Sequence, residues 1–123
     1  MRKAALVTSI LAVALQSCSA YAAGSYEGTW QGSSKGALGP GCGTTTAATM
    51  VVQGDRVVGE DAISAGSAMP AGRFAIRGNV STDGAFSGKV GEWGAKGKFA
   101  GDTFDGDYEF GPCTMLMHLT RIK

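Results

Sequence analysis

RFAIRGNVSTDGAFSGKVGEWGAKGKFAGDTFDGDYEF, residues 73–110, is the stretch that decides how this chain folds. Apolar and polar side chains alternate along it with a period of two, which is the spacing of a β-strand with one buried face. Glycine interrupts the stretch too often for an apolar stripe at helical spacing to form. We therefore expect four consecutive antiparallel strands here, joined by short turns.

The register of the first and last of these hairpins follows from keeping the apolar side chains on one face. Val80 is expected opposite Phe86, across a three-residue loop at 82–84 whose last residue is the glycine that such a loop favours. Phe99 is expected opposite Phe104, across a tight Gly-Asp turn. Turn chemistry and apolar pattern agree in both hairpins, which supports the assignment.

The middle hairpin is expected to pair Val90 with Ala95 across a four-residue loop at 91–94. The full register then places four glycines side by side on the apolar face, namely Gly78, Gly88, Gly97 and Gly106. Glycine weakens a strand unless something needs the room that it leaves. Two interpretations stay open: tight coiling with bulky neighbours such as Trp30 filling the gap, or space for a ligand.

The outer face of the same strands carries charges at matching positions. The register sets Lys98 opposite Asp105 and Lys96 opposite Asp107, and opposite charges across a hairpin are favourable. This pairing supports a solvated charge ladder for the acidic side chains rather than paired catalytic carboxylates or a calcium site.

The same alternation continues on both sides of this stretch. We expect an all-β fold, a small antiparallel up-and-down barrel of about eight short strands, in which closure removes the exposed sheet edges. The expected strands are 26–32, 45–53, 56–60, 73–80, 85–90, 95–100, 103–110 and 113–122. Residues 23–123 form the single barrel domain.

The N-terminal residues have the pattern of a secretory signal peptide. A basic start at residues 1–3 precedes an apolar run at 4–15, and small residues follow with cleavage expected after Ala22. The apolar run is shorter than the roughly 20 residues that a spanning helix needs. Residues 1–22 are therefore expected to be removed, and the mature protein to be periplasmic or secreted.

A second reading of the same segment stays open. Leu15-Gln16-Ser17-Cys18 resembles the cleavage box of bacterial lipoproteins, in which the cysteine becomes the lipidated first residue, although Gln16 departs from that pattern. In this alternative the protein is an outer-membrane lipoprotein anchored through Cys18. Otherwise Cys18 is discarded with the signal.

Two cysteines remain in either case, Cys42 and Cys113. Export to an oxidising compartment favours a disulfide between them. Closing so long a loop stabilises a small domain by about 4 kcal/mol in the chain-entropy model.

Charge and motifs argue against nucleic-acid binding, catalysis and metal binding. The chain has a net charge of +1 and no clustered basic stretch, so we expect no nucleic-acid binding. It lacks the motifs of serine hydrolases, zinc proteases and phosphate loops. Its single histidine, His118, is expected on the outer face of the last strand as a surface or packing residue. We expect no enzyme activity, no cofactor and no metal site.

Barrel topology also predicts where the connections lie. The tight turns gather at one rim, and the other rim collects the longer connections at 33–43, 61–72, 91–94 and 111–112. Candidate contact residues at this long-loop rim are Leu38, Met69, Pro70 and Trp93. Trp93 is interpreted either as a contact residue or as a plug that folds back into the barrel mouth.

Gly28-Thr29-Trp30, on the expected first strand, is similar to the Gly-x-Trp signature of the calycin superfamily. This group includes lipocalins, fatty-acid-binding proteins, avidins and small bacterial metalloprotease inhibitors. The resemblance implies a basic partner for Trp30 on the last strand, and Arg121 stands at a matching position. Size and the single disulfide suit the inhibitor family, but that family's inhibitory N-terminal segment has no residue-by-residue match here.

Together these observations predict an exported, non-catalytic β-barrel binding module that acts through its long-loop rim. Its partner is expected to be a small apolar ligand or a protein, as for a protease inhibitor or an envelope interaction partner. A lipid-anchored structural envelope protein is the other alternative, and membrane attachment is expected only through Cys18.

Overall fold

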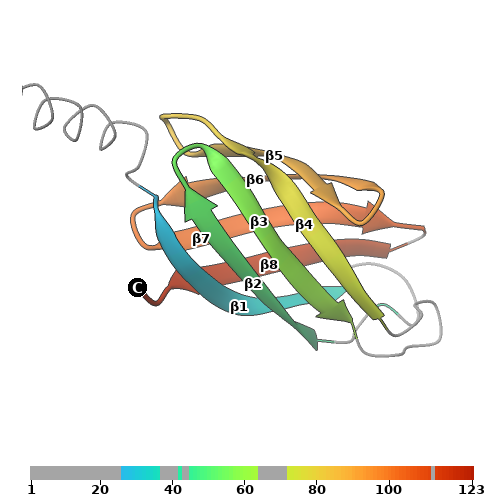
Figure 1. Ribbon diagram of the computed structural model, residues 1–123. Coiled ribbons are helices and arrows are strands. Elements are labelled where there is room, and N and C mark those ends of the chain that lie inside the picture. The colour runs from blue at the N-terminus through green and yellow to red at the C-terminus, as the bar shows by residue number, and fades with distance from the viewer. Residues whose placement is uncertain (1–25, 37–41, 43–44, 64–71, 112) are drawn as a thin grey trace, which may run out of the picture.

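A computed structural model describes residues 26–36, 42, 45–63, 72–111 and 113–123 (Figure 1). Alternating side chains and turn-forming glycines produce eight strands in this part of the chain. They are β1 (Gly28–Gly36), β2 (Thr45–Gln53), β3 (Arg56–Ile63), β4 (Gly72–Val80), β5 (Ala85–Val90), β6 (Trp93–Ala100), β7 (Thr103–Phe110) and β8 (Cys113–Arg121). Within these ranges no helix is long and apolar enough to cross a membrane.

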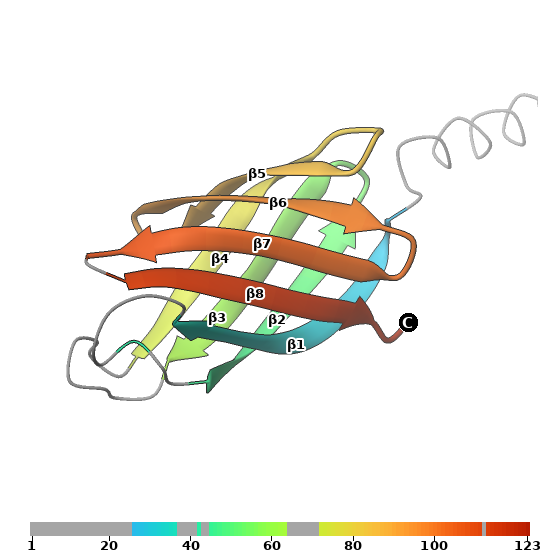
Figure 2. The ribbon, with the colours of Figure 1, turned by 180° about the vertical axis from the view of Figure 1, so that it is seen from behind.

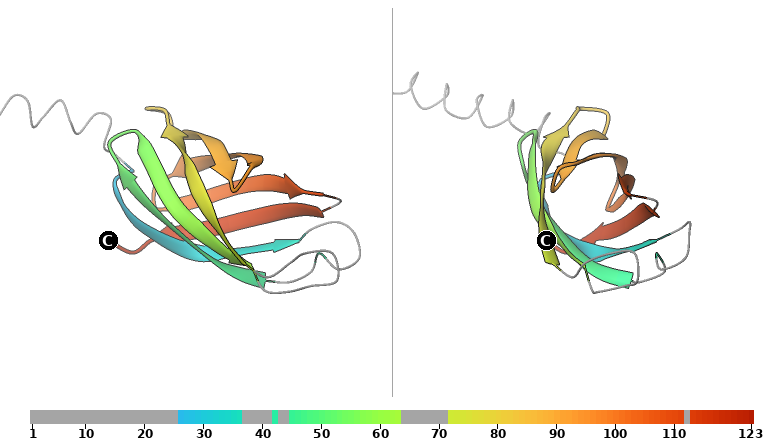
Figure 3. Two further views of the ribbon diagram at one scale, coloured as in Figure 1. Left: turned by 45° about the vertical axis from the view of Figure 1, so that its right-hand side comes forward. Right: turned by 90° about the vertical axis from the view of Figure 1, so that its right-hand side faces the viewer.

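The strands form a closed antiparallel barrel in which each pairs with its neighbours in sequence. The first and last strands close the circle, with Trp30 on β1 opposite Arg121 on β8. In Figure 2, which views the molecule from the opposite side, β6, β7 and β8 lie toward the viewer, and the right-hand view of Figure 3 looks more nearly along the barrel. The predicted all-β barrel with one disulfide is confirmed.

Strands β1 and β3 extend further at their C-terminal ends than the sequence indicated. β1 continues to Gly36 and β3 to Ile63, beyond the expected ends at residues 32 and 60. Ser34 and Asp61 therefore lie within strands instead of rim loops, and both side chains are buried. Polar residues at inward positions made these strand ends resemble loops.

The register of the first and last hairpins of the deciding stretch is confirmed. Val80 lies opposite Phe86, and Phe99 lies opposite Phe104. The 82–84 loop closes with Gly84 at a φ of 94°, in the left-handed region that favours glycine.

The register of the middle hairpin was predicted wrongly. Val90 lies opposite Trp93 rather than Ala95, so that the connection is the two-residue turn Gly91-Glu92. Gly91 has a φ of 60°, the conformation that a two-residue hairpin with glycine at its first central position requires. The shorter turn places Trp93 inside the strand, where its ring packs against the barrel core.

This shift of two residues breaks the expected glycine row into two separate pairs. Gly78 lies opposite Gly88, and Gly97 lies opposite Gly106. Between the two pairs, Gly88 faces Ala95 instead of a glycine. The predicted row across four strands is therefore wrong.

Phenylalanine rings occupy room that the paired glycines leave. A Cβ atom added to Gly97 would lie 2.5 Å from Cζ of Phe104, and one added to Gly78 would lie 2.7 Å from Cε1 of Phe86. Bulky neighbours thus fill these positions, but they are phenylalanines and not Trp30. At Gly88 an added Cβ would instead meet backbone, 2.1 Å from the carbonyl oxygen of Arg77.

Large side chains fill the inside of the barrel. Trp30 and Phe99 are fully buried, with ring centroids 4.8 Å apart, and Phe104 follows at 4.5 Å from Phe99. Further residues buried to below 2 % exposure are Met50, Val52, Val57, Ile76, Val90, Tyr108, Met115 and Leu119. The barrel is a packed core, and what it offers to partners lies on its rims and outer wall.

Candidate functional site

The two ends of the barrel differ in their connections, although the four-residue loop predicted at 91–94 is a two-residue turn. One end, which we call the tight-turn rim, carries the turns at 54–55, 81–84 and 101–102 together with Tyr26 and the C-terminal residue. At the other end, which we call the loop rim, residues 37–44 connect β1 to β2 and residues 64–71 connect β3 to β4. Leu38, Met69 and Pro70 belong to these connections and lie outside the described residues.

Trp93 sits at the loop rim and turns its ring inward. It is half-buried between Phe74, with ring centroids 5.3 Å apart, and Phe110, at 4.2 Å. Phe74 and Phe110 also meet edge to face at 6.1 Å. These three rings, which we call the rim aromatic cluster, cover the core at the barrel mouth. This arrangement corresponds to the alternative in which Trp93 folds back and plugs the mouth.

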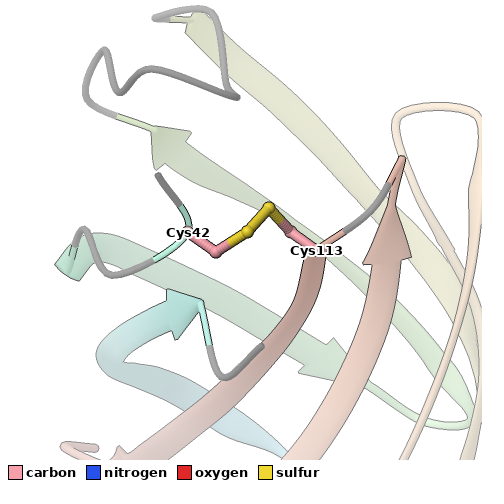
Figure 4. Close-up of a disulfide and its surroundings, with 2 residues drawn as sticks. All are labelled: Cys42 and Cys113. Carbon is pink, nitrogen blue, oxygen red and sulfur yellow. A yellow bond between two sulfur atoms is a disulfide. The ribbon is translucent and has the colours of Figure 1, made fainter. Parts of the chain in front are cut away.

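The disulfide fixes the same rim. Cys42 and Cys113 are both buried, with Cα atoms 5.7 Å apart (Figure 4). Cys113 begins β8, and Cys42 lies just beyond Gly36, where an added Cβ would come within 1.3 Å of the Cys42 carbonyl oxygen. The bridge thus holds Cys42 close to the end of β1 and to the start of β8.

Beneath the loop rim lies a buried polar cluster that the sequence analysis did not identify. The carboxylate of Asp61 accepts hydrogen bonds from the hydroxyl of Ser34 at 2.7 Å and from that of Tyr108 at 2.5 Å. All three residues are at most 1 % exposed. The cluster links β1, β3 and β7 across the barrel, and its three members all occupy inward positions of the period-two pattern.

The environment of this cluster changes the acidity of its phenol. Burial raises the pKa of Tyr108 well above its ordinary value of 10.0, and the hydrogen bond and negative charge of Asp61 raise it further. Tyr108 therefore stays a neutral donor to Asp61 throughout the physiological range. The cluster ties strands together and presents no free group to a substrate.

At the opposite end, Arg121 covers the ring of Trp30. Its guanidinium carbon lies 4.9 Å from the ring centroid, and the indole N–H of Trp30 donates to the Tyr26 carbonyl at 3.0 Å. Arg121 also forms an ion pair with Asp102 at 2.9 Å. The basic partner that the Gly-x-Trp resemblance implied is thus in contact with the tryptophan.

On the outer face, His118 is exposed, which agrees with the surface alternative and not with the packing alternative of the prediction. Its Nδ1 lies 2.7 Å from the Asp105 carboxylate. The expected register of Lys98 with Asp105 is correct, but the two do not form an ion pair. Lys98 turns to the Asp83 carbonyl at 2.6 Å, which lies on the neighbouring turn. In the described ranges, no three histidine, cysteine or acidic side chains are grouped to hold a metal ion.

Comparison with models of known protein families, with curated proteins and with solved structures finds no match to this chain.

An open groove adjoins the rim aromatic cluster on the outer wall. Glu92 and Trp93 line it at the loop rim, and Lys96, Asp107 and Glu109 line it further along β6 and β7. Its mixed charges and one aromatic edge suit a polar protein surface better than an apolar small molecule.

Proposed function

We propose that this chain is an exported, non-catalytic β-barrel that binds a protein partner through its loop rim. The observation that carries the proposal is the contrast between the two ends of the barrel. The strand ends joined by both long connections lie at the loop rim together with the rim aromatic cluster, whereas the described connections at the other rim are tight turns. Rigid barrels commonly carry their contacts on such loops.

A protein partner fits the packing better than a small apolar ligand does. Ligand-binding barrels keep open space inside, on the order of 300 Å³ or more. Here the rings of Phe86 and Phe104 occupy the room beside Gly78, Gly97 and Gly106, and the core also contains the fully buried Trp30 and Phe99. The small-ligand alternative would require these rings to move.

We infer further that the barrel is calycin-like, and the stacked pair of Trp30 and Arg121 supports this. The protease-inhibitor alternative is less favoured, because only residues 23–25 lie between the expected cleavage site and Tyr26. Tyr26 already packs on Phe99, with ring centroids 5.6 Å apart. That leaves too short a segment to reach into a protease cleft from the N-terminus.

The proposal holds for either form of the N-terminus. The chain meets the barrel at Tyr26, on the tight-turn rim. A lipid on Cys18 would tether that rim and leave the loop rim facing away from the membrane.

Site-specific photocrosslinking in the native host tests the proposal. A benzophenone amino acid replaces Glu92, exposed at the loop rim, or Thr82, exposed at the tight-turn rim, as a matched control. We expect a discrete light-dependent protein adduct from position 92 and none from position 82. Adducts from position 82 alone, or none from either position, would overturn the loop rim as the binding surface.

A further inference from the structure

A large part of the outer wall is strongly basic. The outward side chains of four consecutive strands, β3 to β6, include six exposed cations and one carboxylate, Glu60. The cations, which we call the basic wall, are Arg56, Arg73, Arg77, Lys89, Lys96 and Lys98. Glu60 is engaged by Arg73 at 3.0 Å, and Lys96 and Lys98 lie opposite Asp107 and Asp105 of β7. The members without a carboxylate opposite or in contact are therefore Arg56, Arg77 and Lys89. Strands β3 and β4 lie toward the viewer in Figure 1.

The centre of the basic wall places like charges against each other. Arg77 on β4 lies directly opposite Lys89 on β5. Neither side chain, nor that of Arg56 on β3, forms an ion pair or hydrogen bond with another described residue. Like charges directly opposite in a sheet are destabilising, and such local conflicts concentrate at functional surfaces.

Two exposed valines continue the same row. Val51 on β2 is 37 % exposed and lies opposite Val58 on β3, which is 41 % exposed. Val58 in turn lies opposite Arg77. One line across four strands therefore carries two apolar side chains followed by two cations without a carboxylate partner.

We propose that the basic wall docks the barrel, lying on its side, onto an anionic lipid bilayer. Binding to such an interface combines attraction of Lys and Arg to anionic headgroups with shallow insertion of apolar side chains. The row from Val51 to Lys89 supplies both the cations and the apolar side chains that such binding needs. A soluble polyanion would use only the cations. The row from Val51 to Lys89 shares no residue with the groove beside the loop rim, and it adds a route to the membrane that does not depend on Cys18.

Vesicle binding of the purified chain tests the proposal, with Cys18→Ser introduced so that no lipid is attached. We expect at least tenfold stronger binding to vesicles with 30 % phosphatidylglycerol than to pure phosphatidylcholine, weakening as salt rises. Arg77→Gln with Lys89→Gln should weaken binding about 25-fold, at roughly fivefold per cation. The matched pair Lys35→Gln with Lys123→Gln removes the same charge elsewhere and should stay within about twofold.

Two controls distinguish lipid docking from loss of folding and from binding to a soluble polyanion. Removing the Arg77–Lys89 repulsion should leave the melting temperature unchanged or higher, so a loss of binding cannot be ascribed to unfolding. Val51→Ser with Val58→Ser should weaken vesicle binding but not binding to dextran sulfate. Absent binding to anionic vesicles, equal losses in the two charge pairs, or valine changes without effect would each overturn lipid docking.

Discussion

Arg121 on the last strand lies over the ring of Trp30 on the first, with 4.9 Å between the guanidinium carbon and the ring centroid. The same guanidinium donates to the carbonyl oxygens of Glu27 at 2.9 Å and Gly101 at 3.2 Å, and pairs with Asp102. One side chain thus joins β1, β8 and the turn before β7. It closes the barrel where the first strand, β1, meets the last strand, β8.

Replacing Arg121 with alanine should destabilise the barrel by about 3 kcal/mol, because cation–π contact and several charge-assisted hydrogen bonds are lost together. Arg121→Lys should retain only part of this stability, since an ammonium group cannot reproduce the several planar N–H donors of the guanidinium. Urea unfolding measures the effect. Asp102→Asn removes the exposed ion pair alone and should cost under about 1 kcal/mol; an equal loss would contradict a role for the ring contact.

Gly97→Ala should destabilise the protein by about 1–3 kcal/mol, because the new methyl group would overlap the Phe104 ring. Gly94→Ala, on the same strand, meets no atom within 4 Å and should change stability by less than about 0.5 kcal/mol. Thermal unfolding of both variants checks this. Adding Phe104→Leu should reduce the cost of Gly97→Ala; strictly additive effects would show that the ring is not the cause.

Tyr108→Phe should cost about 1–3 kcal/mol, since the buried Asp61 carboxylate loses the donor at 2.5 Å. Tyr26→Phe is the matched control, because the hydroxyl of Tyr26 forms no hydrogen bond with a described residue. Chemical denaturation of both variants would measure the difference. Equal effects of the two substitutions would contradict a specific role for the Asp61 cluster.

The raised pKa of Tyr108 also predicts how stability changes in alkali. A group whose pKa is higher in the folded state gives its full stabilisation below its unfolded pKa and loses it as pH rises above that value. The unfolded value is the ordinary 10.0, so this contribution should decline above about pH 10. Unfolding curves between pH 8 and 11.5 should show a steeper decline for the wild type than for Tyr108→Phe; parallel declines would argue against the shift.

Trp93→Ala should lower the melting temperature, because the ring packs against Phe74 and Phe110 at the barrel mouth. We expect a cost of about 2 kcal/mol for this half-buried side chain. Glu92→Ala, in the adjoining exposed turn, should have little effect on stability. A melting temperature unchanged by Trp93→Ala would restore the alternative in which this tryptophan only contacts a partner.

The alternation of side chains was sufficient to predict the barrel, because a period of two places Phe86, Phe99 and Phe104 on one face. It was also sufficient for the hairpins at 82–84 and 101–102, whose turn residues and apolar pattern agree. It was not sufficient at 91–94. A two-residue and a four-residue turn keep the same side chains inward there, so parity cannot distinguish them.

The candidate site was predicted less completely than the fold. Ser34, Asp61 and Tyr108 come from three strands far apart in sequence, and a buried carboxylate is recognisable only once its donors are placed around it. Polar residues near strand ends usually mark loops, and that rule set the expected ends of β1 and β3 too early. On the outer wall, the predicted Val80–Phe86 register already implies that Arg77 lies opposite Lys89. The position of Val58 opposite Arg77 depends on the β3–β4 register, which the sequence analysis did not predict.

The pairing of the first strand, β1, with the last strand, β8, has a consequence for engineering. The Thr29 amide donates to the Lys123 carbonyl at 3.2 Å, and the Ile122 amide donates to the Thr29 carbonyl at 2.8 Å. Both ends of the described chain therefore meet at one place, so a short peptide can join Lys123 to Tyr26. Reopening the chain between Gly101 and Asp102 would give a circular permutant in which every strand keeps both of its neighbours.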